Sequence, residues 1–235
     1  GLADSGSHMI VVDMGAGTTD IAALARLGNR TLELPEARVT LKQAGDFVDN
    51  VIANMVLETA AWARTPEQKA DLWSVLMRQM RDIKEGVFAD GKATLRHQGR
   101  TLSLAMRDIE RDADFKEFAK ALTQAYDHSL AIVRDDAAAR GRTEVQAIAV
   151  GGGAAAPFIQ DLVRRKTGRG AVRVVPRPAT PDWAHAREFQ GNLAPVFPQL
   201  AIAIGGALAP DGMLAAQPSF SRAANDRSGI AVEPD

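Results

Sequence analysis

The chain has 235 residues, a formal net charge of −1 and no cysteine. The lack of cysteine excludes disulfides, cysteine-based zinc sites and thiol nucleophiles, and it agrees with a reducing cytoplasm, which is where we expect the protein. The nearly balanced charge gives no bulk attraction to nucleic acid or anionic lipid, so we expect neither a nucleic acid nor a membrane as a partner.

Apolar periodicity and turn residues predict that strands and helices alternate along the chain. The longest apolar stretch, 193–210, is interrupted by prolines and a glycine pair, so it predicts a buried helix rather than a membrane span. The expected strands lie near 9–14, 18–26, 31–42, 145–150 and 172–175, with a hairpin around Gly99. The expected helices lie at 46–62, 66–87, 115–139 and 158–166, and within 193–210.

The turn between the first two strands is the most informative segment of the chain. It reads D-M-G-A-G-T-T-D over residues 13–20. Gly15 and Gly17 allow backbone N–H groups to approach phosphate oxygens where a side chain would block them. Asp13 and Asp20 would repel phosphate, so their natural partner is Mg²⁺ or its coordinated water. The turn therefore predicts a site for a metal-bound nucleotide, with Thr18 and Thr19 adding hydroxyl donors.

Two other interpretations of this turn stay open at this point. A dinucleotide-binding fingerprint would need a third glycine and a helix directly after the turn, whereas this segment continues with β-branched residues. An ordinary hairpin with glycines in its turn would need no ligand at all.

A second glycine-rich turn follows about 130 residues later. An apolar strand at 145–150 runs into Gly151, Gly152 and Gly153, and a helical pattern begins near Pro157. Small residues at such a junction let a flat ring lie on the backbone, and proline is tolerated in the first turn of a helix. Alone the junction is a weak signal; paired with the first turn it favours a nucleotide site.

Together the two turns resemble the phosphate-2 loop and the adenosine motif in the second half of the Hsp70/actin-like ATPase fold. Three further segments are similar to Hsp70 in particular. They are 43–50, like the G-G-E-D-F-D-N helix start; 81–84, like the E-x-x-K helix; and 197–207, like the connect-2 helix. The resemblance covers roughly residues 9–209.

This resemblance implies an α/β fold, namely an actin-like ATPase (ribonuclease H-like) lobe whose mixed sheet is flanked by helices and carries an inserted smaller α+β subdomain. We expect residues 1–41 and 113–213 to form the core subdomain and 42–112 the insertion over the cleft. The small, polar composition of 214–235 predicts a flexible tail.

The resemblance also implies roles for individual residues. Asp13 and Asp20 would be the catalytic and metal-orienting carboxylates, with ATP or ADP and Mg²⁺ as cofactors. Gly45 and Lys84 would face the ribose. The phosphates would be lined by Gly15, Ala16, Gly17, Thr18 and Thr19, and the adenosine would be carried by Gly151, Gly152 and Gly153. Three positions depart from the family pattern: Ala155 replaces a common arginine, Arg81 a glutamate and Gln199 an acidic residue.

The family's other lobe supplies a phosphate-1 loop and a lysine that this chain does not contain. We therefore expect the chain to be a fragment or truncated form that is a poor ATPase alone, with the N-terminal lobe of the same fold as its partner. A nucleotide-exchange or client protein is a further possible partner of the whole molecule. The alternative hypothesis is a degenerate actin-like scaffold, or a filament-forming protein, without ATPase activity.

Overall fold

The computed structural model describes residues 7–28, 30–165, 172–189 and 193–207. Its centre is a mixed six-stranded sheet in the order β3-β2-β1-β7-β8, with β4 pairing β2. Strands β1 and β2 are antiparallel, whereas β1, β7 and β8 run parallel. The strands are β1 His8–Met14, β2 Thr19–Leu27, β3 Arg30–Glu33, β4 Val39–Leu41, β7 Glu144–Val150 and β8 Arg173–Pro176.

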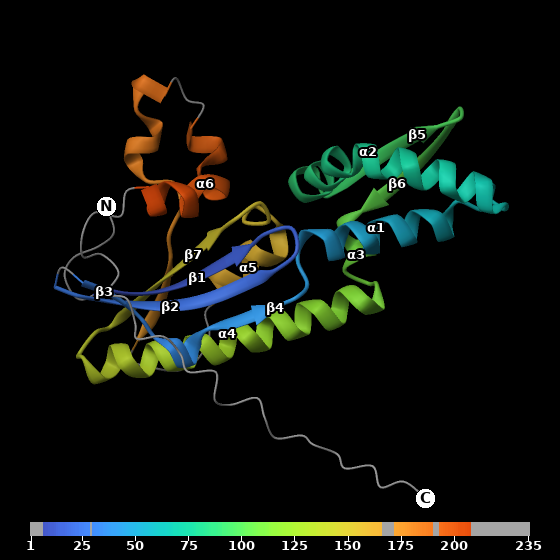
Figure 1. The fold of residues 1–235 in the computed structure, drawn as a ribbon. Coiled ribbons are helices and arrows are strands. Elements are labelled where there is room, and N and C mark those ends of the chain that lie inside the picture. Colours follow the sequence, from blue (N-terminus) through green and yellow to red (C-terminus); the bar gives the residue numbers. More distant parts are fainter. Residues whose placement is uncertain (1–6, 29, 166–171, 190–192, 208–235) are drawn as a thin grey trace, which may run out of the picture.

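Strand β1 is almost wholly apolar because helices cover both faces of the sheet. Ile10 and Val12 belong to the main core, on the face that α4 (Ala113–Ala139) and α5 (Pro157–Arg164) cover. Met9 points the other way and packs with Ile148 and Val150 of β7. The helix α6 (Leu193–Ala207) lies on this second face. Figure 1 shows α4 running along the sheet and α6 on the opposite side.

The remaining helices and a small hairpin form a separate group at one end of the sheet (Figure 1). The group contains α1 Gly45–Thr59, α2 Pro66–Asp90, β5 Lys92–His97, β6 Arg100–Ala105 and α3 Met106–Ile109. Helix α2 starts at a capping box in which the Thr65 hydroxyl accepts from the Gln68 N–H, and it ends at Gly91 in the left-handed conformation. The group is the smaller α+β part of the expected fold class; its boundaries at 42 and 112 stay a prediction.

Most expected elements are confirmed, with shifts at their ends. The strand region 31–42 is divided into β3, a 3₁₀ turn at Pro35–Ala37 and β4, because proline cannot donate to a sheet ladder. Helix α1 ends at Thr59 rather than near residue 62. The helix expected at 158–166 ends at Arg164, since Arg165 is extended, and residue 166 lies outside the described residues. The tail expected at 214–235 lies wholly outside them.

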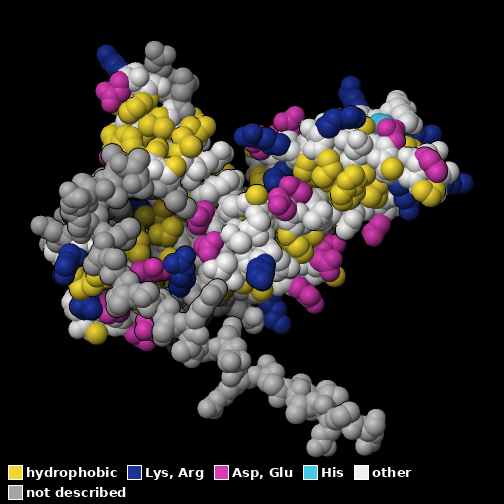
Figure 2. Space-filling model, viewed as in Figure 1, with side chains coloured by type: hydrophobic (Ala, Val, Ile, Leu, Met, Phe, Trp, Pro, Cys, Tyr) yellow, Lys and Arg dark blue, Asp and Glu magenta, His cyan; other side chains and the backbone are white. Residues whose placement is uncertain are grey.

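Apolar side chains gather on the segment that contains α6 and two 3₁₀ turns, Asp182–His185 and Arg187–Phe189 (Figure 2). Trp183, Val196 and Leu200 are each about two-fifths exposed, and the Trp183 ring meets the Phe197 ring edge-on at 5.4 Å. In the part of the chain that the structure describes, no helix is both long and apolar enough to span a bilayer.

Candidate functional site

The turn between β1 and β2 is a tight hairpin whose tip faces solvent. The Gly15 N–H donates to the Thr18 carbonyl at 2.9 Å, and Asp13 stands directly across the ladder from Asp20. Ala16, Gly17 and Thr18 are exposed, so the tip is free to receive a ligand. The two carboxylates lie side by side at its base.

The glycine junction after β7 lies against this hairpin. Because β1 and β7 are parallel, their carboxyl ends meet at one edge of the sheet, and the Gly153 N–H donates to the Met14 carbonyl at 2.9 Å. Gly151 has φ +84°, and a Cβ there would collide with the Asp13 carboxylate and the Met14 carbonyl. Only glycine allows this approach. The two sequence motifs therefore form one continuous surface.

The start of α1 is attached to the same turn. The Gly45 and Asp46 N–H groups donate to the carbonyls of Gly15 (3.1 Å) and Ala16 (2.8 Å). These bonds satisfy two donors that a helix N-terminus leaves without intrahelical partners. A Cβ on Gly45 would lie 3.1 Å from the Gly15 oxygen, so glycine permits the close contact. The structure thus places Gly45 beside the turn, as a support for its backbone.

The two threonines of the turn point in different directions. Thr19 is fully buried, and its hydroxyl donates to the Gln43 carbonyl at 2.8 Å. Its side chain fastens the turn to the segment before α1 and does not face the open tip. The exposed Thr18 hydroxyl donates to Asp20 Oδ2 at 3.1 Å. A phosphate would therefore compete with Asp20 for the Thr18 hydroxyl. The backbone N–H groups of 16–18 would not face this competition.

The two carboxylates have unlike surroundings. Partial burial, and then the neighbouring charge of Asp20, raise the pKa of the Asp13 carboxyl above its usual range. Both oxygens of Asp20 are held by hydroxyls, Oδ2 by Thr18 and Oδ1 by Thr40 of β4 at 2.5 Å. Thr40 is absent from the sequence-based site because no local motif marks it. Only the β2–β4 register, which pairs Asp20 with Thr40, brings it there.

Lys84 and Arg81 lie on α2, in the smaller group of elements. The Lys84 ammonium is 2.7 Å from Asp49 Oδ1, and this ion pair joins α2 to α1. Arg81 pairs with Glu85 one turn along the same helix, on an exposed face. Lys84 is thus linked to the β1–β2 turn through α1, whose first residues are bonded to that turn. The Arg81–Glu85 pair is solvent-exposed, as is typical of surface ion pairs.

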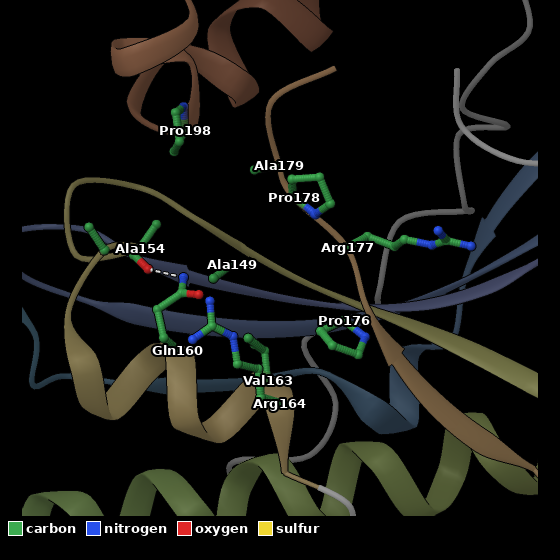
Figure 3. Close-up of a pocket in the computed structure, with 11 residues that line it drawn as sticks. Ala149, Ala154, Gln160, Val163, Arg164, Pro176, Arg177, Pro178, Ala179 and Pro198 are labelled. Carbon is green, nitrogen blue, oxygen red and sulfur yellow. Dashed lines mark hydrogen bonds between the residues drawn. The ribbon is translucent and has the colours of Figure 1, made fainter. Parts of the chain in front are cut away.

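A cavity of about 420 Å³ adjoins the glycine junction on the α5 side of the sheet (Figure 3). Ala149, Ala154 and Ala155 line it from β7 and the junction, and Gln160 lines it from α5 with its amide donating to the Ala154 carbonyl at 2.6 Å. Pro198 of α6 closes one side, where its carbonyl accepts from the Gly151 N–H at 2.8 Å. Gln199, which departs from the family pattern, is exposed. Ala155 contributes a small, uncharged side chain to this wall, whereas Arg164 and Arg177 also line the cavity.

The carboxylates alone do not make a metal centre. Among the described residues, no group of three or more histidine, aspartate or glutamate side chains is placed to hold a metal ion. Two facing carboxylates suit Mg²⁺, which keeps several waters and takes its other ligands from phosphates. The donor set therefore fits a metal that arrives with a nucleotide.

The mixed sheet, with two glycine turns meeting at one edge, defines an actin-like ATPase lobe. Residues 1–180 match the Hsp70 protein family, and the chain belongs to that family. It is also similar to the actin-like protein MamK of Paramagnetospirillum magneticum, 51% identical over 51 residues, and to that of Magnetospirillum gryphiswaldense, 46% identical over 55 residues. These matches cover 22% and 23% of this chain and 14% of each relative, so the chain spans only a small part of their length.

Proposed function

We propose that this chain is a lobe that binds ATP or ADP together with Mg²⁺. The main support is the contact between the two turns, where the Gly153 N–H donates a hydrogen bond to the Met14 carbonyl and Gly151 lies against Asp13. The turn offers the backbone N–H groups of 16–18 to the phosphates, and the backbone at 151–153 offers a surface to the nucleoside. Family membership supports the same assignment.

In this proposal Asp13 and Asp20 hold the metal, directly or through its waters. The bound Mg²⁺ would neutralise phosphate charge and so assist phosphoryl transfer. The pKa of the Asp13 carboxyl is raised by partial burial and then by the charge of Asp20, and a bound cation would offset both effects. The binding of metal and the binding of nucleotide should therefore depend on each other.

We further propose that hydrolysis needs a second lobe of the same fold, because phosphoryl transfer requires donors on several sides of the nucleotide. The attachment of α1 to the phosphate turn gives a route by which a bound nucleotide would set the position of α1 and, through the Asp49–Lys84 pair, of α2. A nucleotide-exchange or client protein would act on the assembled molecule.

Isothermal titration calorimetry of the 235-residue chain tests the binding function. ATP and ADP, each with Mg²⁺ and with EDTA, should give saturable heats, with tighter binding in the presence of Mg²⁺. No heat at millimolar nucleotide under either condition rejects the proposal. GTP serves as the comparison for the base side, where Ala155 replaces the usual arginine.

The second candidate function is an actin-like scaffold or filament, and the similarity to two proteins named actin-like favours it over other non-enzymatic functions. Light scattering distinguishes the two candidates. Assembly on addition of ATP would support a filament, whereas an unchanged signal together with calorimetric binding would support the lobe of a non-filamentous ATPase.

A further inference from the structure

Thr40 is an exposed residue whose side chain nevertheless contacts a carboxylate of the candidate site. It is the exposed middle residue of the three-residue strand β4, and the register pairs it with Asp20 of β2. Its hydroxyl donates to Asp20 Oδ1 at 2.5 Å. Hydroxyl to carboxylate hydrogen bonds of this length are among the strong ones in proteins.

This bond has a specific consequence for the Asp20 carboxylate. One oxygen is held by Thr18 from the turn and the other by Thr40 from the neighbouring strand. The carboxylate is therefore fixed in rotation, opposite Asp13 across the ladder. An ionised carboxylate has about four acceptor positions, so two remain for other donors. Those positions suit water molecules bound to a metal.

The fold itself does not need the Thr40 hydroxyl. The side chain is exposed, and valine has the same shape and an equal preference for strands. A bond between exposed groups adds little to folding because water would satisfy both partners. The hydroxyl therefore has its main effect on the orientation of Asp20.

We propose that Thr40 is a positioning residue that aims the Asp20 carboxylate at the water shell of the nucleotide-bound Mg²⁺. This inference rests on the proposed function and extends it. Asp20 acts through metal-bound water in this inference, because the Thr18 and Thr40 hydroxyls occupy one acceptor position on each of its oxygens and leave the others for donors such as bound water. The pair Asp20–Thr40 thus belongs to the metal side of the site, while Thr18 stands between metal and phosphate.

The test compares Thr40→Val with Thr40→Ser and with the matched control Thr94→Val. Thr94 is an exposed strand threonine on β5 for which the structure gives no side-chain hydrogen bond. Calorimetry measures the ATP dissociation constant of each variant with Mg²⁺ and with EDTA. We expect Thr40→Val to weaken Mg²⁺-dependent binding about tenfold, the effect of one charge-assisted hydrogen bond, and to leave binding in EDTA unchanged. Thr40→Ser and Thr94→Val should bind as the wild type does.

Two outcomes would overturn the inference. In the first, Thr40→Val keeps the wild-type ratio of the two dissociation constants. In the second, it weakens binding equally with Mg²⁺ and with EDTA, which would mark a purely structural role. If Thr40→Val does not fold, a Thr40→Ser protein that loses the Mg²⁺ dependence would contradict the inference equally. Failure of the wild type to bind any nucleotide would instead reject the proposed function, so the two failures are distinguishable.

Discussion

Strand β1 places a titratable side chain near each of its ends, His8 at the start and Asp13 next to the last residue. His8 is buried, and its Nε2 lies 2.7 Å from Asp136 Oδ2 of α4. Arg140 first, and then His8, hold the pKa of the Asp136 carboxyl below its usual range. At the other end partial burial, and then the charge of the facing Asp20, raise the pKa of the Asp13 carboxyl.

The difference between the two ends separates structure from function. At the His8 end the Asp136 carboxylate has Arg140 as an opposite charge and the buried His8 ring as a second close partner, so these contacts stabilise the fold. At the Asp13 end like charges are brought together at an open edge, which costs stability unless a cation arrives. Such an arrangement is typical of a ligand site.

The largest expected effect comes from a substitution at the Asp13 end of β1. Gly151→Ala should lower the free energy of unfolding by about 2–4 kcal/mol, because the added Cβ meets Asp13 and Met14 and the residue must keep a positive φ. Urea unfolding followed by circular dichroism measures it. Gly152→Ala is the control, since a Cβ there has no neighbour within 4 Å. Equal stability of the two variants would show that the junction does not lie against β1.

The second substitution removes a contact at the His8 end of β1. Asp136→Ala removes the partner of a buried histidine, and we expect it to cost about 1–3 kcal/mol of unfolding free energy. Asp135→Ala, on the exposed face of the same helix, should be nearly neutral. Nucleotide binding should survive in both variants, as measured by calorimetry. A stable Asp136→Ala protein that had lost binding would contradict the division of β1 into two ends.

The third change sharpens the comparison by making the ligand end neutral. Asp13→Asn should weaken Mg²⁺-dependent ATP binding by at least about tenfold, because one of the two metal-holding charges is lost. It should also raise the melting temperature of the nucleotide-free chain at neutral pH, since the partly buried charge and its repulsion with Asp20 both disappear. Unchanged affinity would remove Asp13 from the site, and a lowered melting temperature would mean that its charge stabilises the fold.

The smallest effect is a pair of opposite pH dependences. The folded pKa of Asp136 lies below the ordinary 3.8, so its contribution to stability is present above that value and lost as the pH falls through the folded pKa. The folded pKa of Asp13 lies above 3.8, so the fold loses stability as the pH rises from 3.8 through that pKa. Chemical unfolding measures the free energy of unfolding across this pH range. In Asp136→Ala the decrease of that free energy toward acid pH should be smaller, and in Asp13→Asn the decrease as the pH rises above 3.8 should be absent. A reversed assignment would refute the account of both ends.

The sequence was sufficient for the parts of the site that are local in the chain. The turn at 13–20 and the junction at 151–153 could be predicted as glycine turns after buried strands, because the apolar, glycine and carboxylate pattern of each lies within a few neighbouring residues. The helix starting near Gly45 was also predictable from apolar periodicity. The same periodicity extended α1 past Thr59, because Trp62 is apolar; in the structure the Trp62 ring instead packs against His97, with centroids 5.5 Å apart.

The long-range partners could not be predicted from one sequence. Thr40 reaches Asp20 only through the strand register, and Asp136 meets His8 from 128 positions away. Burial of the Thr19 hydroxyl against Gln43 likewise depends on how the segment before α1 folds back. Local patterns carry no signal for these contacts, because tertiary packing decides them.

The most direct test of the central claim is the response of backbone amide signals to Mg²⁺-ADP in ¹⁵N-labelled protein. The account predicts saturable chemical-shift changes at 15–18 and 151–153, at the carboxyl ends of β1 and β7, with little change at His8 and Asp136. An unperturbed spectrum at millimolar Mg²⁺-ADP, or changes confined to the His8 end, would contradict it.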